Sequence, residues 1–274
     1  MTRLFFILIV SSFILQLSAQ SIGTYLGDED ILYAQTKQVN QFFRRFNAEE
    51  GTDGKRYYAG DPYYRDHLLR NKYLSILFDQ ENTRLTDTLK NQFISYVMDP
   101  DHPNFLDFHG GSWFAEVTTK FLYKGTEEPL TLFLKLQEEN VGSKWVITNV
   151  YFEPFHQIFA NNKNDTVKFL HPLSHELDFM NLITVFKDRQ SVEQYASREY
   201  KPDYLTLFIY EVKQSNLIYK TVQHVKFHFF QIPGWYFELD DFNRPGYNSG
   251  WLISNLIQIT DEEKAMIMDI IYHR

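Results

Sequence analysis

The sequence repeats itself at an offset of 106 residues, the distance from Trp145 to Trp251. WVITNV at residues 145–150 returns as WLISNL at residues 251–256, and every substitution between them is conservative. The same offset aligns Thr119–Tyr123 with Val225–Phe229, and residues 73–77 with residues 179–183. Three matches at one offset predict that two copies of a single folding unit make up the body of the chain.

Each copy has a pattern of two helices followed by strands. The first predicts helices at 65–80 and 82–98, where apolar residues recur at helical spacing, and strands at 113–123, 130–136 and 145–152 after turns at 125–129 and 140–143. The second predicts helices at 173–187 and 191–198 and strands at 204–213, 217–230, 235–239 and 250–259. A further helix is expected at 29–46, and another at 260–272 begins with a capping box of Thr260 and Glu263.

Helices followed by an antiparallel sheet whose last strand carries a W-x-I-x-x-V or W-x-I-x-x-L pattern resemble the nuclear transport factor 2-like, or cystatin-like, α+β superfamily. The resemblance implies two cone-like units, each wrapping a sheet around a pocket, and it covers about two thirds of the chain. Such folds host isomerases and dehydratases as well as binding and purely associative domains. The first copy departs from the pattern at residues 99–108, where a polar segment with two prolines replaces the expected first strand. We therefore expect an α+β fold with units at 20–159 and 171–274, joined by a linker at 160–170.

The N-terminus predicts export. One basic residue, Arg3, precedes an apolar run from Leu4 to Leu17, and the small residues Ser18 and Ala19 offer a peptidase site after residue 19. The run is shorter than the roughly 20 residues of a spanning helix. Residues 1–19 are thus expected to be a signal peptide, and the mature protein to be secreted or periplasmic, with no integral membrane segment.

The amino-acid composition limits which classes of site and partner are possible. The chain has no cysteine, which excludes disulfides, thiolate metal sites and cysteine nucleophiles, and its formal net charge is −8. The excess of acidic over basic side chains repels the phosphate backbone of nucleic acids, so we expect no nucleic-acid partner. We expect no cofactor, and a small molecule, a glycan or an envelope protein as partner. A glycosylation sequon begins at Asn164 in the predicted linker.

The strand at 217–230 carries the best candidates for chemistry. His224, Lys226 and His228 alternate with apolar residues and so share one face, on which the two imidazoles stand about 13 Å apart along the strand. A solvated face is the simpler interpretation. If that face lines a pocket, His228 and Lys226 could recognise an anion or carboxylate, and His228 or Glu116 could act as a catalytic base.

The densest set of potential metal ligands lies within eleven positions: Asp99, Asp101, His102, Asp107 and His109. Their spacing fits no known metal motif, and the prolines at 100 and 103 favour an ordinary loop. His109 also opens a His-Gly-Gly segment typical of some oxyanion holes, but no G-x-S-x-G nucleophile motif accompanies it. A glycine turn is the alternative.

For three further groups of residues, a structural role is the main alternative to a functional one. Trp113, Trp235, Tyr63 and Tyr64 could stack on sugar rings, or could fill the core of a curved sheet. His171 and His175 stand at a helix start, where they are expected to cap it. Glu238, Asp240 and Asp241 are paired carboxylates, for which we expect an exposed hairpin.

The sequence therefore favours an exported binding or scaffolding protein of the cell envelope. The alternative is a pocket enzyme of isomerase, dehydratase or hydrolase type that uses His228 or Glu116 on a concave sheet face. A closed pocket containing a buried ionisable group would favour the enzyme. A large exposed apolar patch would favour a structural subunit.

Overall fold

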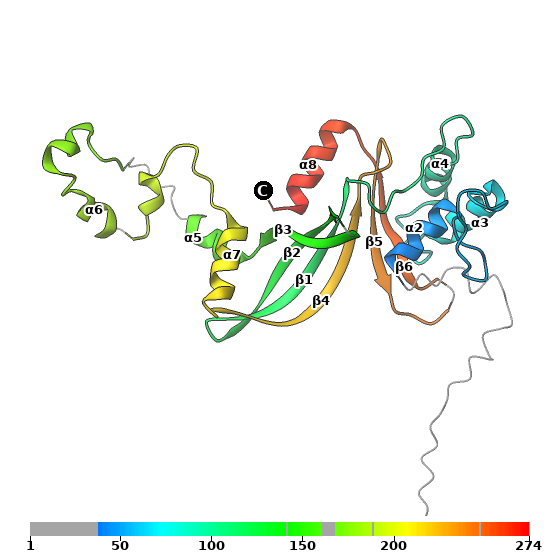
Figure 1. The fold of residues 1–274 in the computed structure, drawn as a ribbon, viewed down its shortest axis with the longest axis horizontal. Coiled ribbons are helices and arrows are strands. Elements are labelled where there is room, and N and C mark those ends of the chain that lie inside the picture. The colour runs from blue at the N-terminus through cyan, green and yellow to red at the C-terminus, as the bar shows by residue number, and fades with distance from the viewer. Residues whose placement is uncertain (1–37, 141, 161–167, 188, 247, 274) are drawn as a thin grey trace, which may run out of the picture.

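The computed structural model describes residues 38–140, 142–160, 168–187, 189–246 and 248–273 (Figure 1). The predicted signal peptide, the sequon at Asn164, most of the predicted linker and most of the helix expected at 29–46 lie outside these residues. Helices and one antiparallel sheet make up the described chain, which confirms the α+β class. Within the described residues, no helix is both long and apolar enough to span a bilayer.

The described strands form a single six-stranded sheet in the order β3-β2-β1-β4-β5-β6. The strands are β1 (Trp113–Tyr123), β2 (Thr126–Glu139), β3 (Gly142–Tyr151), β4 (Leu217–Phe229), β5 (Trp235–Phe242) and β6 (Gly250–Gln258). β1 pairs with β4 along its whole length, so the two predicted sheets are one. The expectation of a separate sheet in each half was wrong, because β1 and β4 pair with each other.

The β1–β2 hairpin is tighter than expected. Lys124 and Gly125 both have positive φ, 51° and 86°, the backbone of a two-residue type I′ turn. β2 therefore begins at Thr126, and Pro129 lies inside the strand opposite Lys120, where a turn was predicted.

Three N-terminal helices cover one face of the sheet. They are α2 (Val39–Asn47), α3 (His67–Ile76) and α4 (Asp87–Val97). The phenylalanines of α2, at positions 42, 43 and 46, are spaced to lie on one side of the helix, and all three are buried. They pack with Trp113, Phe229 and Phe237 in the main core. After α3 the chain bridges β6, where Asp79 N donates to Ile253 O (2.9 Å) and Arg244 pairs with Asp79 (2.6 Å).

The opposite face carries α8 (Asp261–Ile271), and the far ends of the strands carry α5 (Glu153–Ala160) and α7 (Tyr204–Lys213). The predicted capping box is confirmed, because Thr260 accepts from Glu263 N and Glu263 accepts from Thr260 N. The strand expected at 204–213 is instead the helix α7, capped by Asp203, whose carboxylate accepts from Thr206 N (3.1 Å).

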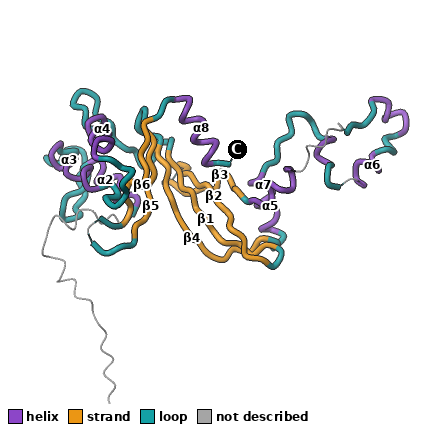
Figure 2. The backbone as a smooth tube through the Cα atoms, turned by 180° about the vertical axis from the view of Figure 1, so that it is seen from behind, coloured by secondary structure: helices purple, strands orange, loops and turns teal. Residues whose placement is uncertain are grey.

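Between α5 and α7 the chain leaves the sheet. Figures 1 and 2 show residues 168–187 and 189–203, which we call the arm, projecting from the body on the side of α5 and α7. The helices predicted at 173–187 and 191–198 are shorter in the arm: the 3₁₀ helix η2 (Pro172–Leu177), α6 (Leu182–Lys187) and the 3₁₀ helix η3 (Val192–Tyr195). His171 caps η2 as predicted, its Nδ1 accepting from Leu173 N (3.2 Å).

Candidate functional site

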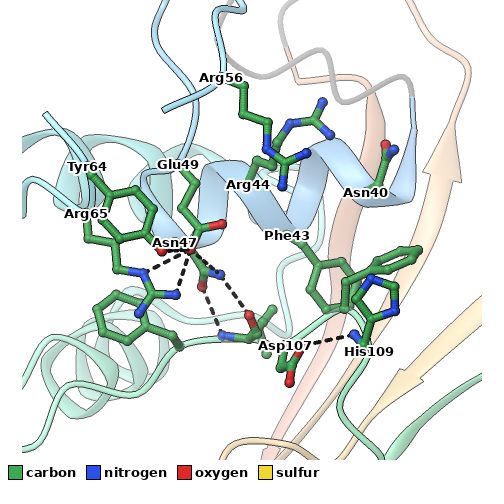
Figure 3. A pocket seen from close by; sticks show the side chains of 13 residues that line it. Asn40, Phe43, Arg44, Asn47, Glu49, Arg56, Tyr64, Arg65, Asp107 and His109 are labelled. Atoms are coloured by element: carbon green, nitrogen blue, oxygen red, sulfur yellow. Dashed lines mark hydrogen bonds and ion pairs between the residues drawn. The ribbon is translucent and has the colours of Figure 1, made fainter. Parts of the chain in front are cut away.

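A cleft of about 540 Å³ opens beside α2 (Figure 3). α2 contributes Asn40, Phe43, Arg44 and Asn47 to its lining, and the loop before β1 contributes Phe105–His109. The loop before α3 adds Arg56, Tyr64 and Arg65. The lining thus contains three arginines and two carboxylates, those of Glu49 and Asp107. This part of the surface has an excess of basic side chains although the chain as a whole is acidic.

Arg44 is held by a buried carboxylate. Its Nε donates to Oε2 of Glu50 (2.7 Å), which is 1% exposed and also accepts from Gln41 through Oε1 (2.8 Å). Arg45 approaches the same carboxylate at 3.4 Å. Burial lowers the pKa of Arg45, although Glu50 opposes the shift. Glu50 therefore fixes the last turn of α2 and orients Arg44 along the cleft.

Arg56 differs from its neighbours. Among the described residues it has no carboxylate within ion-pair distance, and its guanidinium lies over the ring of Tyr58 at 5.0 Å. Arg65, by contrast, donates through Nε and Nη2 to Oε1 of Glu49 (2.9 and 2.7 Å), which also accepts from the Tyr64 hydroxyl (3.2 Å). Arg56 is thus a cation of the cleft whose charge no described acidic group balances.

A stack of three side chains fixes two residues of the cleft lining, Arg65 and Phe105. The ring of Phe105 lies between the guanidinium groups of Arg65 and Arg70, each 4.1 Å from its centroid. Arg70 is 2% exposed and donates to the carbonyls of Phe46 (3.0 Å), Val97 (3.0 Å) and Asn104. Burial, followed by repulsion from Arg65, lowers the pKa of Arg70 to about 10. This arginine ties the ends of α2 and α4 to the loop that carries Phe105.

Three of the predicted site residues line the cleft: Tyr64, Asp107 and His109. Burial and the charge of Glu49 raise the pKa of Tyr64. Asp107 caps its own turn by accepting from His109 N (2.9 Å), and His109 Nδ1 lies 3.0 Å from Ser143 Oγ.

The remaining metal candidates, Asp99, Asp101 and His102, lie in one turn that the Asp99 carboxylate stabilises. Oδ1 of Asp99 accepts from the backbone of Asp101 (2.8 Å) and His102 (3.0 Å), and these bonds lower the pKa of Asp99. In the part of the chain that the structure describes, no three His, Asp or Glu side chains are grouped to hold a metal ion. The carboxylates of Asp99 and Asp107 therefore cap turns of this loop.

The other predicted group is a polar network on the sheet face that carries α8. The register sets Glu116 of β1 opposite Lys226 of β4, and His228 of β4 opposite Glu238 of β5, so all four share this face. His228 Nε2 lies 2.8 Å from Oε2 of Glu116, and its Nδ1 lies 2.8 Å from the hydroxyl of Tyr236. Tyr236 donates to Oε1 of Glu238, whose other oxygen accepts from Lys226 (2.8 Å).

The network holds its carboxylates ionised. Burial alone would raise the pKa of Glu116, but the hydrogen bond and charge of His228 outweigh it and the pKa is lowered. For Glu238, Lys226 and Tyr236 likewise outweigh burial and lower the pKa. Burial and the charge of Glu238 raise the pKa of Tyr236, so its hydroxyl remains a donor.

His228 is closed to a substrate. It is 2% exposed, the ring of Phe114 stacks on it at 4.9 Å, and both its nitrogens are engaged by Glu116 and Tyr236. Glu238 was expected in an exposed hairpin, but it lies in β5 with 15% of its side chain exposed. That expectation was wrong because β5 lies between β4 and β6, and Lys226 and Tyr236 bond the Glu238 carboxylate on the face of the sheet.

The aromatic residues that could stack on sugar rings fall into two groups, buried tryptophans and more exposed tyrosines. Trp113 and Trp235 are each 3% exposed, and both belong to the main core. Trp113 stacks on Phe229 at 5.3 Å and donates through Nε1 to Phe108 O (3.1 Å). Neither indole has a face open to a sugar. Tyr63 is 62% exposed and its ring lies 5.9 Å from that of Tyr57, outside the cleft lining.

The sequence did not single out the arginines of the cleft. Arg44, Arg56 and Arg65 are scattered over 22 positions, and only the adjacent pair Arg44 and Arg45 on a predicted helix gave a signal. Tyr236, the centre of the sheet-face network, was also missed.

Comparisons with protein-family models, curated proteins and solved structures found no match to this chain. The resemblance to the nuclear transport factor 2-like superfamily therefore stays a prediction.

Proposed function

We propose that the chain is an exported, soluble binding protein of the cell envelope whose cleft beside α2 binds a small organic anion. One observation carries the proposal: Arg56 faces the cleft with no acidic partner among the described residues, while Arg44 beside it uses Nε for Glu50 and keeps its terminal nitrogens for a ligand. Guanidinium groups bind carboxylates and phosphates in preference to neutral groups.

The walls of the cleft define the rest of the ligand. Phe108 supplies half-buried apolar ring surface, and Asn40 and Tyr64 supply hydrogen-bonding groups. An anionic group on a flat ring, such as an acidic sugar or an aromatic acid, matches both features. The ligand class agrees with the expectation of a small molecule or glycan partner.

The enzyme alternative has less support. It requires His228 or Glu116 to reach a substrate, and His228 lies beneath Phe114 with both nitrogens occupied. The network of Glu116, His228, Tyr236 and Glu238 is better explained as a polar layer that specifies how β1, β4 and β5 align.

We also infer that the repeat reflects an internal duplication. At the offset of 106 residues β1 falls on β4 and β3 on β6, and each triplet runs outward from the β1–β4 pair. The matched tryptophans, Trp145 of β3 and Trp251 of β6, both contact the ring of Phe227, at 6.1 and 4.8 Å. These equivalent positions support two copies of a three-stranded unit that together form the ligand-bearing scaffold.

A thermal-shift series on the processed chain tests the binding function. Glucuronate, benzoate and inorganic phosphate are compared with chloride at equal ionic strength. We expect one organic anion to raise Tm with concentration, since a ligand at 100 times its Kd adds about 2.7 kcal/mol to stability.

Arg56→Gln should abolish the shift, whereas the control Arg84→Gln, at an exposed arginine outside the cleft lining, should keep it. No shift with either organic anion, or an equal loss in the two variants, would refute the proposal.

A further inference from the structure

The arm has almost no core of its own. Among its described residues only Ser174, Val185 and Ser191 are buried, and Val185 alone of these is apolar. A segment of this size cannot bury enough surface to be stable alone, and segments below about 40 residues usually need disulfides, metals or association. The chain has no cysteine, and no described group of side chains could hold a metal. Association is the remaining source of stability.

The arm exposes an apolar surface of the size that an interface needs. Six large side chains are more than half exposed: Phe169 (68%), Leu173 (51%), Leu177 (61%), Met180 (75%), Ile183 (60%) and Phe186 (65%). They offer roughly 700 Å² if each full side chain presents on the order of 200 Å². A standard protein interface buries about 800 Å² on each partner.

The charge of the arm indicates which kind of partner covers its apolar side chains. Residues 168–203 contain five basic and six acidic side chains, so the arm is nearly neutral in a chain of charge −8. The absence of basic excess argues against an anionic membrane, which polybasic segments recognise. Two arms carrying both signs can face each other without net repulsion. Because the arm projects away from the body in Figures 1 and 2, two copies can join their arms while the acidic bodies stay apart.

We propose that the arm is a self-association surface, and that two copies of the chain form a dimer by burying these six side chains against each other. The contact is isologous, the same patch on both subunits, and a two-fold axis closes it at a dimer. The dimer is independent of the cleft, since the cleft lining contains no arm residue.

Light scattering coupled to size exclusion tests the dimer on the processed chain. We expect twice the monomer mass at about 10 µM. In Met180→Glu/Phe186→Glu the dimer Kd should rise at least about 100-fold, because each buried carboxylate would lack a partner. The matched control is Leu68→Glu on α3, which is 79% exposed in the body and should leave the dimer unchanged.

A crosslinking measurement covers the case in which the double variant does not fold. Ile183→Cys adds the only thiol to a cysteine-free chain, and a bifunctional maleimide should join two subunits in high yield. Leu68→Cys should remain uncrosslinked. A monomeric wild type up to about 100 µM, whether or not it binds vesicles or another envelope protein, would overturn the proposal. So would equal crosslinking at the two positions.

Discussion

His228 connects three strands through its side chain. It lies on β4, contacts Glu116 on β1 and Tyr236 on β5, and is 2% exposed. In His228→Phe the ring fits a similar space, but Glu116 loses its hydrogen-bond partner and Tyr236 one of two. Leaving such groups without partners costs about 1–3 kcal/mol. We expect a free energy of unfolding about 2 kcal/mol lower in urea denaturation.

His224→Phe is the matched control, on the same strand and face with 54% of its side chain exposed. It removes only an exposed pair with Asp240 (3.0 Å), so it should change the free energy of unfolding by no more than about 1 kcal/mol. Equal losses in the two variants would show that the network contributes nothing specific.

The two carboxylates of this network give stability a pH dependence. The pKa values of Glu116 and Glu238 are both below the ordinary 4.5. The unfolded chain therefore binds protons first as the pH falls, so their contribution is complete above pH 4.5 and is lost as the pH falls through the folded-state pKa values. We expect the free energy of unfolding to decrease below about pH 4.5. In Glu238→Gln the slope of that decrease should be smaller, and a slope equal to that of wild type would contradict this origin.

Part of this site could be predicted from the sequence. Alternation along residues 224–228 placed His224, Lys226 and His228 on one face, because the side-chain period of a strand is two. The partners could not be predicted. The contacts of His228 depend on the register of β4 with β1 and β5, and Glu116 is 112 residues away along the chain. The cleft arginines were missed because Arg44 lies on α2 while Arg56 and Arg65 lie in the irregular loop before α3, whose path no local pattern predicts.

At the scale of elements, α7 shows how packing overrides local preference. Residues 204–213 are rich in aromatic and β-branched side chains, which favour a strand. Yet Tyr204, Leu205 and Phe208 are spaced for one side of a helix, and all three pack in the second core cluster. Asp203 caps the first turn. The helix expected at 260–272 was predicted correctly because its capping box is a local signal.

α8 is attached to the sheet mainly through its C-terminal end. Tyr272, 6% exposed, lies 5.0 Å from the ring of Phe114 and 4.7 Å from that of Phe133. Removing a buried aromatic ring costs about 3–5 kcal/mol, so Tyr272→Ala should lower the free energy of unfolding by about 3 kcal/mol. Ile270→Ala on the same helix, 73% exposed, should be nearly neutral in the same denaturation series. A comparable loss from Ile270→Ala would mean that α8 docks differently.

At the scale of the molecule, the repeat led to an expectation of two units with a sheet in each. The repeat describes the strands well, but a repeat cannot show whether two copies pair with themselves or with each other. The pairing of β1 with β4 decides this. It is a contact between residues more than 90 positions apart, such as Tyr123 and Leu217, and no local pattern encodes it.

The shared sheet predicts that neither half folds alone. A fragment of residues 20–159 would expose the inner edge of β1 and would lose Phe227 and Phe229, which pack beside Trp113 in the main core. An unpaired edge and an open core leave little to offset the conformational entropy of about 140 residues. We expect the fragment to give a poorly dispersed amide NMR spectrum, and co-expression with residues 168–274 to restore the dispersed spectrum of the whole chain. A well-dispersed spectrum from the isolated fragment would mean that the first half is a domain in its own right, and that the β1–β4 pairing adds to its fold without creating it.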